Sequence, residues 1–272
     1  MIDIHTHILP GVDDGAPDTV ASLLMAEDAV AQGVHTVVAT PHLYWAGREA
    51  LSASDIQQAV RELNELVQAK GIAVTILPGC EIPIAPDLLE RLEHEEWMSL
   101  GGEARTVLVE PPWQEWTAYA TSVLRRTIEA GWTVVLAHPE RNSVLQREKS
   151  LVTELVQMGV HLQVTTSSLV GGRTGPSAAR CAYALMEGRL VSVVASDCHD
   201  PDFRRCEMRQ AYQLLQRVYG AHVARMLTLT VPDALLQGKT ITLEQVWQKV
   251  STDENRWKRW LRGILRRETD DG

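Results

Sequence analysis

Apolar, mostly β-branched residues gather in seven short runs along the chain, and turn-forming residues bound each run. The segments between the runs, such as TVASLLMAEDAVAQG and ASDIQQAVRELNELVQAKG, place apolar residues at a helical period and end in glycine. Successive runs start roughly 27 to 40 residues apart, which is the size of one strand-plus-helix unit. The pattern therefore predicts seven strands, at residues 2–4, 36–40, 73–77, 106–110, 133–137, 161–165 and 191–195.

The regular alternation of strands and helices predicts a parallel α/β architecture. A doubly wound sheet and a closed barrel share this periodicity, so the pattern leaves both open. The 272 residues match about one barrel-sized domain, and no Pro/Gly/Ser-rich linker, low-complexity tract or close repeat divides them. We expect one domain over residues 1–245, followed by a C-terminal appendage over residues 246–272.

Composition and charge narrow the class of protein. The 26 Lys and Arg residues against 35 Asp and Glu residues leave a formal charge of -9, which argues against nucleic acid as a partner. No run reaches the roughly 18 apolar residues of a membrane span, and the start MIDIHTH lacks the basic and apolar stretches of an export signal. The four cysteines form no C-x-x-C pair. We expect reduced thiols and a cytoplasmic protein.

The appendage differs from the rest of the chain in charge. Its segment RWKRWLRGILRR, residues 256–267, holds six basic residues and no acidic one. The apolar members Trp257, Trp260, Leu261, Ile264 and Leu265 recur at helical spacing and predict an amphipathic helix. Two indoles beside a cationic helix face suit contact with the anionic inner surface of the cell membrane, or with a membrane-proximal partner. Packing against the outer helices of the domain, or fraying in solution, are the alternatives.

Metal-ligand side chains follow six of the seven predicted strands, at the ends where parallel α/β folds place their active sites. A lone histidine or carboxylate at such a place usually caps or packs, but the joint placement favours a shared metal centre. One closed tetrahedral site could not use so many ligands, whereas two or three ions with bridging carboxylates could. With one aspartate from the first loop, the candidates are His5, His7, Asp14, His42, Glu81, Glu110, His138, Asp197 and His199.

Two details of this set stay open at this point. Asp13 has the same chemistry as Asp14, and the DDG sequence that contains both is also an ordinary turn. Mixed imidazole and carboxylate ligands suit Mn, Fe or Zn better than Mg or Ca.

The sequence also contains a motif for a thiolate mechanism, because Cys198 and Arg204 have the C-x5-R spacing of cysteine-dependent phosphatases. A phosphate cradle needs several free backbone N–H groups and no carboxylate that faces the dianion. Pro201 removes one donor, and Asp200 and Asp202 would repel the substrate. The thiolate mechanism is therefore the weaker alternative.

Seven motifs, in order, resemble the bacterial PHP (polymerase and histidinol phosphatase) superfamily: MIDIHTHILPGVDDGA, TPH, GCEI, LVEPP, LAHPERN, TTSSLVG and ASDCHD. Over roughly residues 1–245 the order and sequence of these motifs are most similar to those of the manganese-dependent tyrosine phosphatases that regulate capsular and extracellular polysaccharide assembly. The resemblance implies a distorted (β/α)7 barrel. It also implies a trinuclear metal centre that the nine candidates hold, with Mn favoured and Fe or Zn as alternatives.

The resemblance also implies two phosphate-binding arginines. Arg141 belongs to the HPER motif, and a second basic residue is expected shortly after the SDxH motif. Arg204 and Arg205 both qualify there, and the spacing favours Arg204. The chain departs from the family at Asp200, where Asn is usual, and at Glu207, where His is frequent, so the substrate rim near this loop is expected to differ.

The implied function is hydrolysis of protein phosphotyrosine on a bacterial tyrosine kinase that controls exopolysaccharide or capsule synthesis. A hydroxide that bridges two metal ions would attack phosphorus, while Arg141 and Arg204 hold the phosphoryl oxygens. The alternatives are a small-molecule phosphatase such as histidinol-phosphate phosphatase, or a non-catalytic module that binds a partner.

Overall fold

The structure is a computed structural model, and it describes residues 1–43, 51–94, 98–171, 174–248 and 250. Within them, eight strands follow one another along the chain, and helices separate all of them except the third and the fourth. The strands are β1 (Ile2–Thr6), β2 (Thr36–Ala39), β3 (Thr75–Pro78), β4 (Glu81–Pro83), β5 (Thr106–Glu110), β6 (Thr133–Ala137), β7 (His161–Thr165) and β8 (Val191–Ala195). Six of the seven predicted strands are confirmed as single strands.

The third predicted strand, over residues 73–77, was wrong in its extent. It starts at Thr75 and is followed by a second short strand, so that β3 and β4 belong to two separate parallel sheets. Gly79 lies at the break, and a larger residue would not fit there, because an added Cβ would lie 2.8 Å from the Val38 side chain. Pro78 and Pro83 end the two strands, and neither has an N–H for a further ladder hydrogen bond.

The two sheets, ordered β1-β2-β3 and β4-β5-β6-β7-β8, join into one distorted barrel. Isolated bridges connect His42 to Glu81 at one junction and Thr6 to Cys198 at the other. At the second junction the His7 amide donates to the Cys198 carbonyl at 2.9 Å. The closed barrel is therefore the correct choice between the two architectures that the periodicity allowed.

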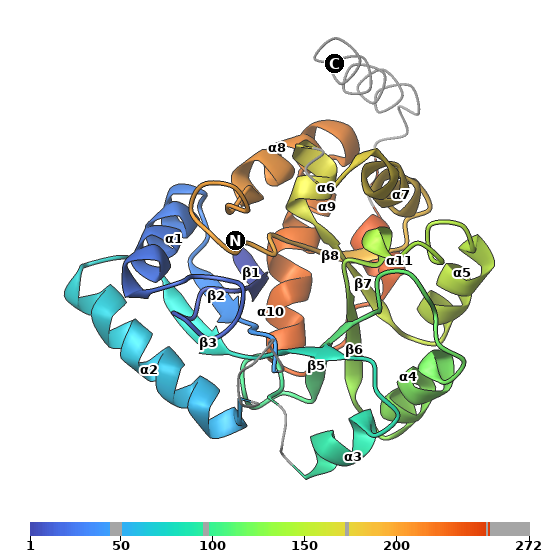
Figure 1. The fold of residues 1–272 in the computed structure, drawn as a ribbon. Coiled ribbons are helices and arrows are strands. Elements are labelled where there is room, and N and C mark those ends of the chain that lie inside the picture. Colours follow the sequence, from blue (N-terminus) through green and yellow to red (C-terminus); the bar gives the residue numbers. More distant parts are fainter. Residues whose placement is uncertain (44–50, 95–97, 172–173, 249, 251–272) are drawn as a thin grey trace.

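Helices surround the strands on the outside of the barrel (Figure 1). The apolar side of α2 shows why: Ile56, Val60, Leu63 and Val67 recur at helical spacing and are all buried. The helices are α1 (Thr19–Ala31), α2 (Ala53–Ala69), α3 (Leu88–Glu93), α4 (Ala120–Glu129), α5 (Lys149–Gln157), α6 (Thr166–Val170), α7 (Pro176–Glu187), α8 (Met208–Tyr219), α9 (Ala221–Arg225), α10 (Val231–Leu236) and α11 (Leu243–Trp247). Two shorter turns are η1 (Pro139–Arg141) and η2 (Met226–Thr230), the second of them π-helical.

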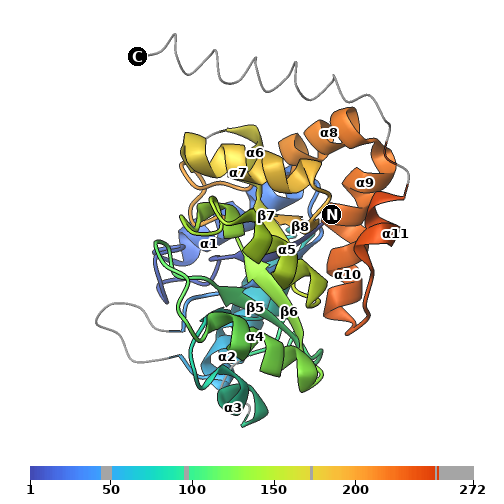
Figure 2. The ribbon, with the colours of Figure 1, turned by 90° about the vertical axis from the view of Figure 1, so that its right-hand side faces the viewer.

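The last helices cover the amino ends of the strands. Figure 2 shows α9, α10 and α11 stacked together on one side of the molecule. Thr106, the first residue of β5, donates its hydroxyl to the Leu235 carbonyl of α10 at 2.8 Å. The Trp247 indole of α11 donates to the carbonyl of Val191, the first residue of β8, at 3.1 Å. The amino end of the barrel is therefore closed by the chain itself.

The predicted boundary at residue 245 lies inside α11, whose Trp247 is buried against the barrel. The predicted amphipathic helix over residues 256–267 lies outside the described residues and stays a prediction. In the described part of the chain, no helix combines the length and the apolar character that crossing a bilayer requires.

Candidate metal centre

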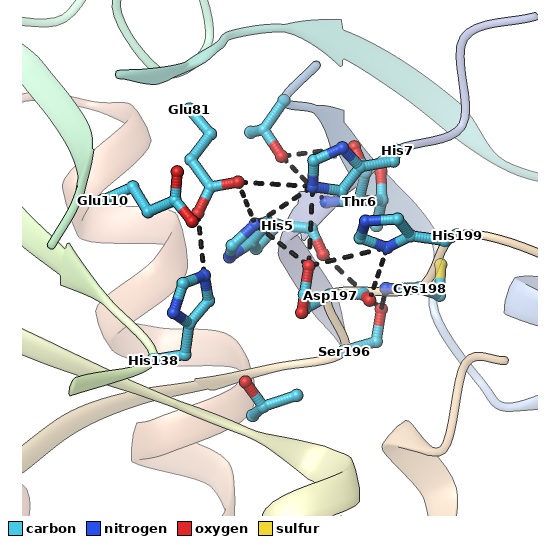
Figure 3. Close-up of polar contacts among 12 residues, drawn as sticks. His5, Thr6, His7, Glu81, Glu110, His138, Ser196, Asp197, Cys198 and His199 are labelled. Carbon is cyan, nitrogen blue, oxygen red and sulfur yellow. Dashed lines mark hydrogen bonds and ion pairs between the residues drawn. The ribbon is translucent and has the colours of Figure 1, made fainter. Parts of the chain in front are cut away.

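The nine candidate ligands converge at the carboxyl ends of the strands, although they come from six strands and one loop. His5 and His7 are fully buried beneath a pocket of about 270 Å³. Figure 3 shows both imidazoles turned toward Glu81 and Asp197, with His138 and His199 on either side. The pocket is lined by the other seven candidates and by three further residues: Asp14, His42, Glu81, Glu110, Trp113, His138, Arg141, Asp197, His199 and Arg204.

The first strand and the residue after it supply two imidazoles, and each imidazole faces the centre with its Nε2 atom. His5 and His7 are two positions apart, and their Nε2 atoms lie 3.4 Å from each other. The His5 Nδ1 donates to the Gln163 side-chain oxygen at 2.9 Å, and the His7 Nδ1 donates to Asp13 at 2.7 Å. Oxygen atoms face both Nδ1 atoms, so these nitrogens are the donors, and a neutral imidazole of this tautomer would have its Nε2 lone pair toward the pocket, as metal-ligating imidazoles require.

The two neighbouring aspartates of the first loop have different places. Asp13 is buried behind His7, and it also accepts from the His42 amide at 3.0 Å. Asp14 lines the pocket, with Oδ1 at 3.4 Å from the His199 Nε2. Gly15 permits this arrangement, since an added Cβ would lie 2.0 Å from the His7 carbonyl oxygen. The structure thus turns Asp14 toward the centre and Asp13 toward the back of an imidazole.

Three overlapping groups of these side chains have the spacing of metal sites, with ligand atoms within 4.8 Å of one another. Glu81 belongs to two of the groups, and its Oε2 lies 3.3 Å from His5, 3.4 Å from His7 and 3.5 Å from His42. Such a shared carboxylate is the kind of group that bridges ions in a multinuclear centre. The groups are His7, Asp14, His42 and His199; His5, His7 and Glu81; and His42, Glu81 and Glu110.

His138 and Asp197 lie outside these three groups but contact them. The His138 Nε2 is 2.9 Å from Oε1 of Glu81, and Asp197 Oδ1 is 3.3 Å from the His5 Nε2. Both residues have a left-handed backbone, with φ of 29° at His138 and 53° at Asp197. Strain of this kind in residues other than glycine concentrates at functional sites, where it aims a side chain.

The electrostatics of the centre suit a group of cations. Burial alone would raise the pKa of Asp197, but His5 and Arg141 hold it well below its usual range. Burial, together with the charge of Glu81, raises the pKa of Glu110 to about 8. Buried carboxylates this close to one another repel, and divalent ions between them would relieve the repulsion. The donor set therefore fits divalent metal.

The two predicted phosphate-binding arginines meet on one carboxylate at the edge of the pocket. The Arg141 Nη1 lies 2.6 Å and the Arg204 Nη2 lies 3.0 Å from Oδ2 of Asp197. Arg205 instead approaches Asp28 of α1 at 3.8 Å. The structure thus places Arg204, and not Arg205, beside Arg141 in the metal pocket.

The thiolate alternative has no support in the geometry. Cys198 is buried, and burial, with the charge of Asp3, raises the pKa of its thiol. The following loop offers no phosphate cradle, because Asp200 already accepts from the amides of Asp202, Phe203 and Arg204. A neutral, buried thiol beside occupied amides is a poor nucleophile.

Sequence reasoning missed three residues of the site. Asp13 was recognised only as a rival to Asp14, and Gln163 and Trp113 were not considered. Gln163 has a visible signal in the sequence. In the predicted strand HLQVT it is an amide between the apolar residues Leu162 and Val164. A fully buried amide in a strand needs partners, and the Oε1 of Gln163 accepts from the His5 Nδ1 and the His138 amide. Trp113 has no comparable signal, because a tryptophan in a loop is more often packing than substrate contact.

Comparison with known proteins gives a consistent relationship over most of the chain. A family model described as capsular polysaccharide synthesis, CpsB/CapC, matches residues 1–237. The tyrosine-protein phosphatase YwqE of Bacillus subtilis is 34% identical over 241 residues, which cover 89% of this chain and 93% of that protein. The tyrosine-protein phosphatase CpsB of Streptococcus pneumoniae is 32% identical over 252 residues, which cover 89% of this chain and all of that protein.

A solved structure extends the likeness to three dimensions. It comes from a study of YwqE from Bacillus subtilis and CpsB from Streptococcus pneumoniae, which describes them as unique metal-dependent tyrosine phosphatases. The match has a TM-score of 0.84 at 34% identity and covers 89% of this chain and 96% of the solved chain.

Proposed function

The chain belongs to the capsular polysaccharide synthesis CpsB/CapC family, and from this premise we propose that it is a metal-dependent protein-tyrosine phosphatase. The observation that carries the proposal is the convergence of nine ligand-type side chains with two arginines on one pocket. A phosphomonoesterase needs a nucleophilic oxygen, neutralisation of the phosphoryl charge and a stabilised leaving group. Ions held by the ligand-type side chains would supply the first two, and the two arginines would add to the second.

The proposed ligands are the nine residues predicted from the sequence, and the three overlapping groups support three ions. Manganese is the favoured metal, and iron or zinc would suit the same mixture of imidazole and carboxylate donors. Divalent ions bound there would supply Lewis acidity, which activates water near neutral pH and neutralises phosphoryl charge. Gln163 and Asp13 would keep His5 and His7 in the tautomer that leaves Nε2 available.

The two arginines would bind the phosphoryl oxygens. Both reach the pocket and share Asp197, which holds their guanidinium groups near each other before substrate arrives. Planar guanidinium groups bind phosphoryl oxygens through paired, charge-assisted hydrogen bonds. A tyrosinate leaving group, with a phenol pKa of about 10, departs more readily than an alkoxide and makes a weaker demand for a general acid.

The proposed physiological substrate is a phosphorylated bacterial tyrosine kinase that controls capsule or exopolysaccharide synthesis. The family description supports the link to capsular polysaccharide synthesis, and the kinase follows from the resemblance of the sequence motifs. The proposed location is the cytoplasm, where the four free cysteines of this chain would stay reduced. Residues 256–267 would add a peripheral contact with the inner face of the membrane.

The test is a pair of activity assays on the purified, metal-loaded protein. A phosphotyrosine peptide should be hydrolysed with a much higher kcat/KM than histidinol phosphate, and chelation should abolish both activities. Cys198→Ser should keep its turnover, because the buried thiol takes no part. A preference for histidinol phosphate would replace this proposal with the small-molecule phosphatase, and absence of any turnover by a metal-loaded protein would favour a binding module.

A further inference from the structure

A second and larger pocket adjoins the metal pocket. It has a volume of about 480 Å³ and extends toward α6 and α7. Four residues line both pockets and therefore form their common border: Trp113, Arg141, Asp197 and Arg204. A phosphoryl group held by the two arginines would thus have the rest of its molecule at the entrance to the larger pocket.

Two aromatic side chains line this larger pocket while remaining open to solvent. Trp113 is 60% exposed, and Phe203, which is the only phenylalanine of the chain, is 80% exposed. They come from different loops, after β5 and after β8, and the Trp113 ring centroid lies 6.4 Å from that of His138. Large apolar groups exposed beside a site of convergent polar groups are typical of ligand contacts.

The loop that carries Trp113 is tied to the segment that carries Arg141. The Asn142 side chain donates to the carbonyls of Pro112 and Glu115, and the Ser143 amide donates to the Trp113 carbonyl at 3.0 Å. The backbone segments that carry the indole and the guanidinium therefore form one hydrogen-bonded unit. This arrangement would keep a fixed distance between a bound phosphoryl group and the aromatic wall.

The loop that carries Phe203 is held in a similar way. The Asp200 carboxylate accepts from three successive amides, which include those of Phe203 and Arg204. The His199 amide closes the turn by donating to the Arg204 carbonyl at 2.8 Å. Asp200 is one of the two positions at which the chain departs from the family resemblance, and its second carboxylate oxygen accepts the Arg204 amide.

We propose that this aromatic pocket, the larger pocket that Trp113 and Phe203 line, receives the phenyl ring of phosphotyrosine while the phosphoryl group occupies the metal pocket. Trp113 and Phe203 would then be specificity-determining residues. The proposal rests on the proposed function, and it identifies the residues that recognise the side chain of the substrate.

Size and chemistry both favour a phenyl ring as occupant. A dry cavity of about 150 Å³ suffices for benzene, so a pocket of 480 Å³ holds one ring and leaves space for adjoining peptide. Stacked or edge-to-face contacts with two aromatic side chains would stabilise the ring. A phosphoserine has only one carbon between the ester oxygen and the backbone, so its phosphoryl group could bind without filling this pocket.

The test compares two phosphonates that differ in the ring and have no ester to cleave. Dissociation constants of benzylphosphonate and methylphosphonate are measured by calorimetry on the Mn²⁺-loaded wild type, Phe203→Ala and Trp113→Ala. The wild type should prefer benzylphosphonate by about tenfold or more. Each alanine variant should reduce this preference three- to tenfold, as expected for the loss of one aromatic contact. Tyr119→Ala, which removes a partly exposed aromatic residue outside both pockets, should keep the wild-type preference.

Two outcomes would overturn the proposal: a wild type that binds both phosphonates equally, or alanine variants that weaken both to the same extent. Failure of the proposed function has a separate signature, which is absence of phosphotyrosine hydrolysis by the wild type. Calorimetry needs no turnover, so the preference for the ring is measured whether or not the peptide is a substrate.

Discussion

The two ends of the barrel bury different kinds of side chain. At the amino end, α10 and α11 cover the strands with apolar residues and neutral hydrogen bonds, such as those from Thr106 and Trp247. At the carboxyl end, imidazoles and carboxylates that include His5, Glu81 and Asp197 are almost completely removed from water. The same strands therefore hold a conventional core at one end and a concentration of ionisable groups at the other.

The difference shows how the barrel separates stability from chemistry. Burial of apolar area and satisfied hydrogen bonds stabilise the amino end without any ligand. The carboxyl end combines carboxylates that repel one another with strained backbone at His138 and Asp197, so its stability depends on the rest of the barrel, and the proposed cations would add to it. Substitutions at the two ends should consequently affect different measured quantities.

The largest effect is expected at the carboxyl end, for Glu81→Ala. This change removes the carboxylate that lies within 3.5 Å of His5, His7 and His42. Activity should fall by about 10³-fold or more, and elemental analysis should show a loss of bound metal. The wild type should melt at a higher temperature with divalent metal than without it, and Glu81→Ala should lose most of that difference.

The exposed Glu129 on α4 provides the matched control, since Glu129→Ala removes a carboxylate far from the pocket. Full metal content and activity in Glu81→Ala would contradict a metal centre built on this residue.

A smaller effect is expected for Arg141→Ala, which should separate substrate binding from metal binding within the carboxyl end. Loss of one charge-assisted donor to the transition state should lower kcat/KM by about 10²-fold, while the metal content stays near that of the wild type. Arg125→Ala on the surface of α4, where Arg125 pairs with Glu154, should have no such effect. An unchanged kcat/KM would remove Arg141 from the site.

The amino end offers a pH test, because β7 begins there with the buried His161. Burial lowers the pKa of His161 to about 4, so as the pH falls the unfolded chain takes up this proton before the folded protein does. Stability is therefore lost as the pH falls from about 6.5 toward 4, and at pH 5 the loss should be about 2 kcal/mol relative to pH 7.

His161→Gln should remove that part of the pH dependence, as measured by urea unfolding at pH 7 and pH 5. His94→Gln, at an exposed position, controls for the removal of an imidazole as such. Equal pH dependence in His161→Gln and the wild type would show that this imidazole titrates normally in the folded state.

The smallest effect is expected for Trp247→Phe at the closed end. The variant keeps most of the ring that packs edge-on against Tyr219 but loses the hydrogen bond to the Val191 carbonyl. The free energy of unfolding should fall by about 1–2 kcal/mol, with kcat/KM within twofold of the wild type. A large loss of kcat/KM in a folded variant would mean that the two ends are coupled.

The amino-acid sequence by itself determined six of the strands, the helical character of the segments between the predicted strands and the residue types of the centre. Runs such as TVVLA form strands because β-branched residues favour that backbone locally, and α2 follows from the spacing of its apolar positions. The chemistry of the centre was visible because parallel strands bring their carboxyl ends to one edge, so a histidine or carboxylate after each strand implies a cluster.

Only the tertiary structure decided which groups meet. It joined β1 to the end of β8, divided β3 from β4 at Gly79, and turned Asp14 rather than Asp13 toward the pocket. It also brought Gln163 to His5 across 158 positions of sequence. Local preferences depend on near neighbours along the chain, whereas these contacts depend on how distant segments pack, and spacing in the sequence does not constrain that packing.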